Sequence, residues 1–307
     1  MITAAPVTEV TVFGLSSGAV FALLALGLVL IYRTTGVMNF AHWAIGLIAV
    51  VGYVMATGLG LPPEVAMPLA LAFGAGSGVV AYRLVFRRIS GARQIIVILI
   101  SIGVAQLYSS LAQFALGFEQ FTRLEPWLPT GDLQIGSVAI RASEIITAAV
   151  AIGVAFAFLI WFRVSRAGRA LRAVAQNREA AMLAGIDDVR YSSLAWGIGS
   201  ALAALALLLV LPHSAGEQGG LITTFDVTPF GTLLIPAFGA ALVGGLVHLP
   251  MAMVGGFVFG LARELMILAP KPWSDLRSSV AAILIVLLLL IRTERFFASR
   301  QELEALE

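Results

Sequence analysis

The feature that most constrains this chain is a succession of apolar runs long enough to cross a lipid bilayer. A hydrocarbon core of ~30 Å requires about 20 apolar residues of α-helix. Six runs are clear and three are shorter: Val10–Tyr32, Val37–Thr57, Val65–Phe86, Ile95–Gly117, Ile145–Val164 and Tyr191–Leu211, then Phe230–Val247, Met251–Ala269 and Ser279–Ile291. The sequence therefore predicts an all-α fold, a polytopic transmembrane helix bundle of about 8–10 membrane segments, some of them short, tilted, broken or re-entrant.

Composition argues against a soluble domain. Of the 307 residues, 60% are hydrophobic and 12% are charged, whereas soluble domains carry roughly 25% charged residues. The pieces between the apolar runs are too short to bury a core of their own. We therefore expect a single transmembrane domain over residues 1–307, with one long polar connection at about residues 163–190.

The distribution of arginine predicts the orientation. Arginines crowd the segments 83–93 and 163–190 and follow the last run at Arg292, Arg295 and Arg300. Because positively charged loops remain on the cytoplasmic side, these stretches are expected inside, with the N-terminus outside and the C-terminus inside. The stretches Phe118–Ser143 and Pro212–Thr228 then become external loops.

Several classes of chemistry have no residues to support them. The chain has no cysteine, and its three histidines, His42, His213 and His248, have no carboxylate at metal-ligand spacing. No phosphate-binding loop is present, since the only lysine, Lys271, lies between two prolines. No basic tract suggests nucleic-acid binding. We therefore expect no catalytic residue, no metal site and no cofactor bound by this chain.

Three pairs of glycines are spaced four residues apart within apolar runs. They are Gly14 and Gly18, Gly74 and Gly78, and Gly256 and Gly260. Small residues at this spacing allow helix backbones to approach closely in lipid. Helix packing is the main interpretation, and a role in a moving gate is the alternative.

Four polar residues stand out within apolar sequence. Asn39 and His42 are three residues apart, which places them near one helical face. They either lock helices together or line a watery path, because polar groups at membrane depth face the bundle interior. Arg263 and Glu264 are sequence neighbours near the end of another run. Snorkelling towards the outer surface, an ion pair with another helix and proton coupling are all open to them.

The connection Arg163–Arg190 predicts a surface helix over residues 169–184. Good helix formers fill this stretch, and Leu171, Val174 and Met182 fall near one face. Gly185 follows as a natural helix stop. The mixed apolar and basic face suits either a docking helix or a helix lying on anionic membrane lipid.

Three motifs carry a resemblance to a known family. Glu179-Ala180-Ala181 followed by Gly185 resembles the coupling-helix pattern of bacterial ABC-importer permeases. The stretch Gly14–Ala41, with Asn39-Phe40-Ala41-His42, is similar to the LivH-type permeases of branched-chain amino-acid importers. Ala240–Gly256 resembles a glycine-rich segment that contains a proline near the C-terminus of that family.

The resemblance implies a permease domain that works with partners in a bacterial inner membrane. It implies two cytoplasmic ATPase subunits carrying ATP and Mg²⁺, a second related permease chain and an external solute-binding protein. The residues expected to line the substrate pathway are Asn39, Phe40, His42 and Trp43, and those expected to serve ATPase coupling are Arg172, Glu179, Ala180, Ala181, Met182 and Gly185.

Departures from the family pattern leave the substrate open. Trp43 stands where the family has glycine, and Val247-His248 and Met251 stand where smaller residues are usual. Branched-chain or related amino acids are the first expectation, with urea, amides and other small solutes as alternatives. Two other functions remain possible for the residues themselves: an ion-coupled secondary transporter, for which Glu264 is the candidate acid, and a membrane scaffold or channel.

Overall fold

The structure is a computed structural model that describes residues 4–116, 122–123, 127–129, 131–135, 138–216, 221–222 and 228–291. Within these residues, seven helices are long and apolar enough to cross a membrane, and two shorter apolar helices accompany them. The predicted all-α bundle is therefore confirmed. Arg292, Arg295 and Arg300, which were predicted to follow the last span, lie outside the described residues.

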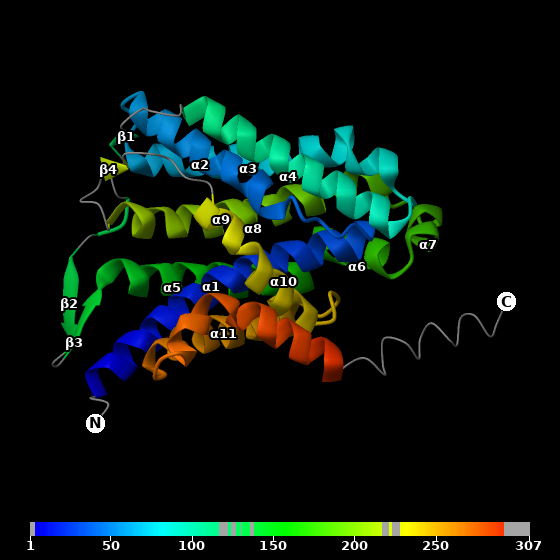
Figure 1. Cartoon of the computed structure of the whole chain (residues 1–307). Coiled ribbons are helices and arrows are strands. Elements are labelled where there is room, and N and C mark those ends of the chain that lie inside the picture. The colour runs from blue at the N-terminus through cyan, green and yellow to red at the C-terminus, as the bar shows by residue number, and fades with distance from the viewer. Residues whose placement is uncertain are drawn as a thin grey trace.

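The long helices lie roughly side by side (Figure 1). In chain order the helices before the polar connection are α1 (Ala4–Thr35), α2 (His42–Gly58), α3 (Pro63–Leu84), the short 3₁₀ helix η1 (Phe86–Ile89), α4 (Gln94–Leu116) and α5 (Ala142–Val164). Those from the connection onward are α6 (Arg166–Gln176), α7 (Arg178–Leu183), α8 (Asp188–Gly216), α9 (Thr228–Thr232), α10 (Leu234–Val243) and α11 (Leu249–Leu265). The 3₁₀ helices η2 (Met266–Leu268) and η3 (Trp273–Ser279) precede a final helix over residues 280–291.

Helices α1, α2 and α8 form the centre of the bundle. Most of their side chains are buried within the chain, whereas α4 and α5 leave many large apolar side chains exposed. Exposed apolar side chains on a spanning helix suit contact with lipid or with another membrane chain. The chain thus surrounds a buried central trio with helices that face outward.

The glycine pairs of α1 and α11 pack directly against each other. A Cβ at Gly260 would lie 2.5 Å from the carbonyl oxygen of Gly14, and one at Gly256 would lie 2.5 Å from the nitrogen of Ala22. A Cβ at Gly18 would lie 2.8 Å from the Cα of Phe257. These distances leave no space for a side chain, so the predicted role of both pairs in helix packing is confirmed.

The third glycine pair brings α3 against α8. A Cβ at Gly78 would lie 2.5 Å from the Cβ of Ser200, and one at Gly74 would lie 2.8 Å from the Cβ of Ala204. Close backbone approach through small residues therefore packs α3 on α8 and α11 on α1, so that both outer helices lie directly against the central trio.

Short strands gather at the end of the bundle where α1 begins (Figure 1). β2 (Asp132–Ile135) and β3 (Val138–Arg141) form an antiparallel hairpin, and β1 (Thr122–Arg123) pairs with β4 (Leu221–Ile222). The β1–β4 pair joins the two stretches that were predicted to be external loops. The arginine-rich α6 and α7 lie at the opposite end (Figure 1), as the predicted orientation requires.

The predicted segment Phe230–Val247 is two short helices. α9 and α10 meet at Leu233, and α10 ends at a tight turn in which Gly245 has φ 61° and Leu246 has φ 59°. In the described ranges it is one of two apolar helical segments shorter than a full span. The other is His42–Gly58, so the expectation that Val37–Thr57 is a clear full-length span is wrong. The expectation that some segments are short or broken is met here, whereas Leu249–Leu268 and Trp273–Ile291 are long enough to cross.

Candidate functional site

The connection between α5 and α8 begins with a tight elbow. The hydroxyl of Ser165 accepts a hydrogen bond of 2.8 Å from the backbone nitrogen of Gly168 and so caps the N-terminus of α6. A Cβ at Gly168 would lie 2.7 Å from the carbonyl carbon of Phe162. Glycine is therefore required for α6 to fold back onto the end of α5.

Arg172 holds this elbow together from inside. Its guanidinium donates to the carbonyl oxygens of Phe162 and Arg163, the latter at 3.1 Å, and lies 5.5 Å from the centre of the Phe162 ring. Arg33 of α1 lies over the same ring at 5.7 Å. Arg172, predicted as a coupling residue, thus braces α6 against α5 and lies near α1.

The single helix predicted over residues 169–184 is wrong, because the chain breaks at Asn177. This residue has an extended backbone, with φ −154° and ψ 106°, and its side-chain oxygen accepts a hydrogen bond of 2.9 Å from the nitrogen of Ala180. An asparagine that caps a new helix competes with continuing the old one. The result is two helices, α6 and α7, which point in different directions (Figure 1).

Gly185 ends α7 as predicted. Its φ of +80° is a conformation that favours glycine. Its nitrogen donates to the carbonyl of Met182, and the nitrogen of Ile186 donates to the carbonyl of Ala181. This pair of hydrogen bonds is the Schellman motif, which satisfies carbonyls that the helix end would otherwise leave unpaired.

Helix α7 presents a mixed apolar and acidic surface. Leu183 is 91% exposed and Met182 is 49% exposed, while Ala181 is buried at 4%. Glu179 and Ala180 are also exposed. In the part of the chain that the structure describes, no hydrogen bond or ion pair engages the Glu179 carboxylate, and Asn177 supplies the N-terminal cap of α7. Met182 therefore does not share the buried face of Leu171 and Val174.

Arg178 fastens α7 to two other elements. Its guanidinium forms an ion pair with the buried carboxylate of Asp188 at the start of α8 and donates to the hydroxyl of Ser90 at 3.1 Å. The hydroxyl of Ser192 donates to the same carboxylate at 3.3 Å. The hydrogen bond to Asp188 raises the pKa of Arg178 above its usual value. A displacement of α7 would therefore pull directly on the start of α8 through this ion pair.

The predicted pathway residues lie around the start of α2 and face two ways. Asn39 and His42 are buried, and the Asn39 side chain accepts a hydrogen bond of 3.0 Å from the nitrogen of Ala41. The His42 ring occupies the crossing of α1 and α8, since a Cβ at Gly27 would lie 2.7 Å from both its Nε2 and the Gly199 carbonyl oxygen. Nδ2 of Asn39 and both ring nitrogens of His42 have no hydrogen-bond partner among the described residues, so the choice between locking helices together and lining a watery path stays a prediction.

Phe40 and Trp43 face a different part of the chain. The Phe40 ring stacks on Phe238 of α10 with centroids 4.6 Å apart, and Trp43 borders Gly231 of α9. Both side chains are only half-buried. The structure thus brings the start of α2 against the broken α9–α10 segment, and the assignment of these residues to the substrate pathway stays a prediction.

Glu264 forms an ion pair that the sequence did not specify. Its carboxylate is buried and pairs with the guanidinium of Arg277 in η3, while Nε of Arg263 lies 4.0 Å from its other oxygen. Among the three predicted interpretations, an ion pair with another element is the one observed for Glu264.

Sequence reasoning missed the roles of five residues that shape the connection between α5 and α8. Ser165, Gly168 and Asn177 set the elbow and the break, and the pairing of Arg178 with Asp188 ties α7 down. Ser165 and Asn177 are typical N-cap residues, so a search for caps within the arginine-rich stretch would have found both.

Comparisons with known proteins place the chain in a family. The model of the family described as branched-chain amino acid transport system / permease component matches residues 10–291. The high-affinity branched-chain amino acid permease BraD of Pseudomonas aeruginosa is 29% identical over 309 residues, covering 95% of each chain. LivH of Salmonella typhimurium is 29% identical over 266 residues, covering 82% of this chain and 83% of LivH.

A solved structure shares the fold. It is a metal-chelate-type ABC transporter in an inward-facing conformation, with a TM-score of 0.51 and 18% identity, covering 92% of this chain and 85% of that one. The spans, the family match and the relatives agree on a multi-pass inner-membrane transport protein. The chain belongs to the family of permease components of branched-chain amino acid ABC transport systems.

Proposed function

We propose that this chain lines the translocation pathway for branched-chain or related amino acids. It would work as a single permease domain over residues 1–307, beside a second related permease chain, two cytoplasmic ATPase subunits and an external solute-binding protein. ATP and Mg²⁺ would be bound by the ATPase subunits. Branched-chain amino acids are the substrates named for the relatives BraD and LivH.

The observation that carries the proposal is the exposed surface of α7. Leu183 and Met182 offer exposed apolar side chains at the arginine-rich end of the bundle. A short helix with exposed apolar anchors suits docking into a hydrophobic groove of another protein. Glu179, exposed beside them, suits a basic group of that partner.

The same connection supplies a route for mechanical coupling. Arg178 ties α7 to Asp188 of α8, and Arg172 ties α6 to the end of α5. Helix α8 in turn packs on α1 at Gly27 and Gly199, beside His42 at the start of α2. When the ATPases close, movement of α6 and α7 would shift these central helices and change which side of the membrane the pathway opens to.

The test replaces the most exposed apolar residue of α7. Leu183→Asp places a charge where an apolar groove is expected to close, so we expect less ATPase to co-purify and ATP-driven uptake of L-leucine to fall. The matched control is Leu59→Asp, because Leu59 is 83% exposed at the opposite, outer end of the bundle. The amount of co-purified ATPase is measured for both variants, and uptake is measured in proteoliposomes.

The two variants separate docking from general damage. Loss of ATPase with Leu183→Asp but not with Leu59→Asp supports α7 as the docking helix. Full ATPase binding and full uptake with Leu183→Asp would show that α7 is not the docking element.

A further inference from the structure

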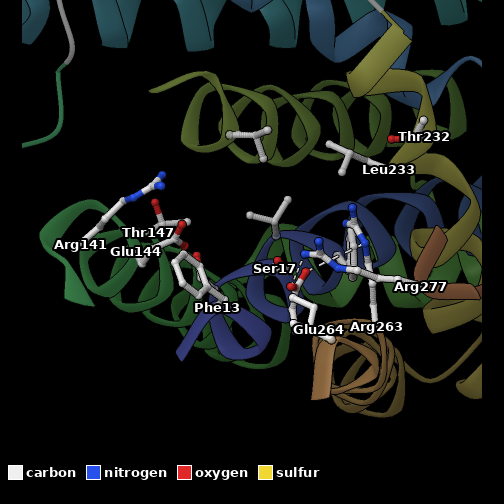
Figure 2. A pocket seen from close by; sticks show the side chains of 15 residues that line it. Phe13, Ser17, Arg141, Glu144, Thr147, Thr232, Leu233, Arg263, Glu264 and Arg277 are labelled. Atoms are coloured by element: carbon white, nitrogen blue, oxygen red, sulfur yellow. Dashed lines mark hydrogen bonds and ion pairs between the residues drawn. The ribbon is translucent and has the colours of Figure 1, made fainter. Parts of the chain in front are cut away.

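A polar cavity of about 480 Å³ lies in the outer half of the bundle. It is lined by the first half of α1, the start of α5, the end of α11 and η3, with α9 nearby (Figure 2). These elements share the end of the molecule that carries the strands, which is the outer side in the predicted orientation. Its volume falls within the roughly 300–1,000 Å³ of small-molecule sites.

One end of the cavity has more positive than negative groups. Arg263, Glu264 and Arg277 meet there from α11 and η3 (Figure 2). One carboxylate is shared by two guanidiniums, since Glu264 pairs with Arg277 and lies 4.0 Å from Nε of Arg263. Arginine has five N–H donors, so a single carboxylate leaves donors unused at this end.

A buried unpaired donor marks the same place. Nε of Arg277 is buried and has no hydrogen-bond partner among the described residues. Leaving such a group unpaired costs free energy, and an incoming carboxylate supplies the missing acceptor. Both the excess charge and the unpaired N–H therefore point to a ligand with an anionic group.

The rest of the cavity is mixed in polarity. Ser17 of α1 faces the Arg263–Glu264 end, while Glu144 and Thr147 of α5 lie at the other end (Figure 2). The hydroxyl of Thr147 is buried and also has no partner in the described structure. The buried side chains of Val20 and Leu233 form an apolar wall of the cavity. A ligand with a charged head and a hydrocarbon side chain fits this combination.

We propose that this cavity is a binding site for a zwitterionic amino acid during transport. The ligand carboxylate binds Arg263 and Arg277, and its ammonium group faces the oxygens of Ser17 and Glu264. Its hydrocarbon side chain lies against Val20 and Leu233. This assignment rests on the proposed function and adds the residues of this chain that recognise the substrate.

The test measures equilibrium binding of radiolabelled L-leucine to the permease–ATPase complex in lipid nanodiscs. Arg263→Gln removes the less engaged guanidinium while keeping the pair between Glu264 and Arg277. We expect it to weaken binding about 10-fold or more, the effect of losing one charge-assisted hydrogen bond. Arg263→Lys keeps the positive charge and should lose less. Lys271→Gln is the control, because it removes a positive charge from the turn between η2 and η3, outside the cavity lining.

Competitors identify which groups of the ligand are recognised. Isoamylamine lacks the carboxylate and isocaproate lacks the ammonium group, so both should displace L-leucine far less well than unlabelled L-leucine does. Inorganic phosphate tests a site that accepts any anion. Wild-type binding by Arg263→Gln, equal competition by isoamylamine, or equal competition by phosphate would each overturn the assignment.

Uptake separates failure of the site from failure of the proposed function. If the wild-type transporter with its binding protein takes up L-leucine while Arg263→Gln binds it normally, only the cavity assignment is wrong. If the wild-type transporter is ATP-active yet takes up no amino acid, the proposed substrate class is wrong, and the cavity assignment with it.

Discussion

The guanidinium of Arg178 forms an ion pair with the buried carboxylate of Asp188, across the turn that joins α7 to α8. Asp188 also accepts a hydrogen bond from Ser192 one turn into α8. The most exposed helix of the arginine-rich end is thereby fastened to one of the three central helices. This ion pair holds the connection between α5 and α8 in a defined position against the membrane helices.

Removing Arg178 should loosen α7. Arg178→Ala leaves the Asp188 carboxylate buried without its cation, which costs about 1–3 kcal/mol. We expect faster amide hydrogen exchange in α7 and weaker ATP-driven uptake, measured by mass spectrometry and in proteoliposomes. Arg166→Ala is the matched control, because Arg166 is exposed on the neighbouring helix α6. Unchanged exchange in the Arg178 variant would contradict the role given to the ion pair.

Gly260 should not tolerate a side chain. Gly260→Val brings a Cβ within 2.5 Å of the Gly14 carbonyl oxygen and separates α1 from α11. Overpacking usually costs about 1–3 kcal/mol, and more where backbone must move. The thermal unfolding midpoint in detergent should therefore fall clearly. Gly103→Val in α4 is the control, because no neighbouring atom lies within 4 Å of its Cβ position; similar loss in both variants would refute the packing argument.

The absence of cysteine allows the pathway prediction to be tested by single thiols. In His42→Cys the thiol lies at the buried crossing of α1 and α8, whereas in Trp43→Cys it lies at a half-buried position near α9. We expect a water-soluble thiol reagent to modify Trp43→Cys faster. Faster labelling of His42→Cys during ATP turnover would instead place His42 on a watery path.

Uptake should not depend on a proton gradient. Glu264, the predicted candidate for ion coupling, is held in an ion pair with Arg277. A protonophore added to proteoliposomes with ATP inside should therefore leave uptake of L-leucine unchanged. Glu264→Gln should lower the thermal unfolding midpoint, because Arg277 loses its partner. Uptake driven by a proton gradient without ATP would support the secondary transporter alternative.

The spans and their packing could be predicted because both depend on residues that are close together in the sequence. The length of an apolar run predicts whether its helix can span the membrane. A pair of glycines four residues apart predicts a surface where another helix can approach, as Gly14–Gly18 and Gly256–Gly260 do. Gly185 likewise carries its own signal, since a positive φ after a short helix favours glycine. The orientation followed from arginine position alone.

The rest depends on contacts between distant residues. The break at Asn177 was missed because the residues on both sides have good helix propensity, and one capping hydrogen bond decided the outcome. The pair between Glu264 and Arg277 needed the turn after α11 to bring η3 back. The position of Arg172 against the end of α5 depends on the elbow at Gly168. The spacing of apolar residues along the sequence does not predict such an elbow.

The packing of α1 on α11 also has a consequence for how the protein is made. Gly14 and Gly18 enter the membrane first, yet the residues they pack against, Gly256 and Gly260, are synthesised near the end of the chain. During most of translation the glycine face of α1 must be covered by lipid or by an insertion factor. The packing around α1 is therefore finished only late in synthesis, and a ribosome that stalls before residue 260 leaves the glycine face of α1 without α11.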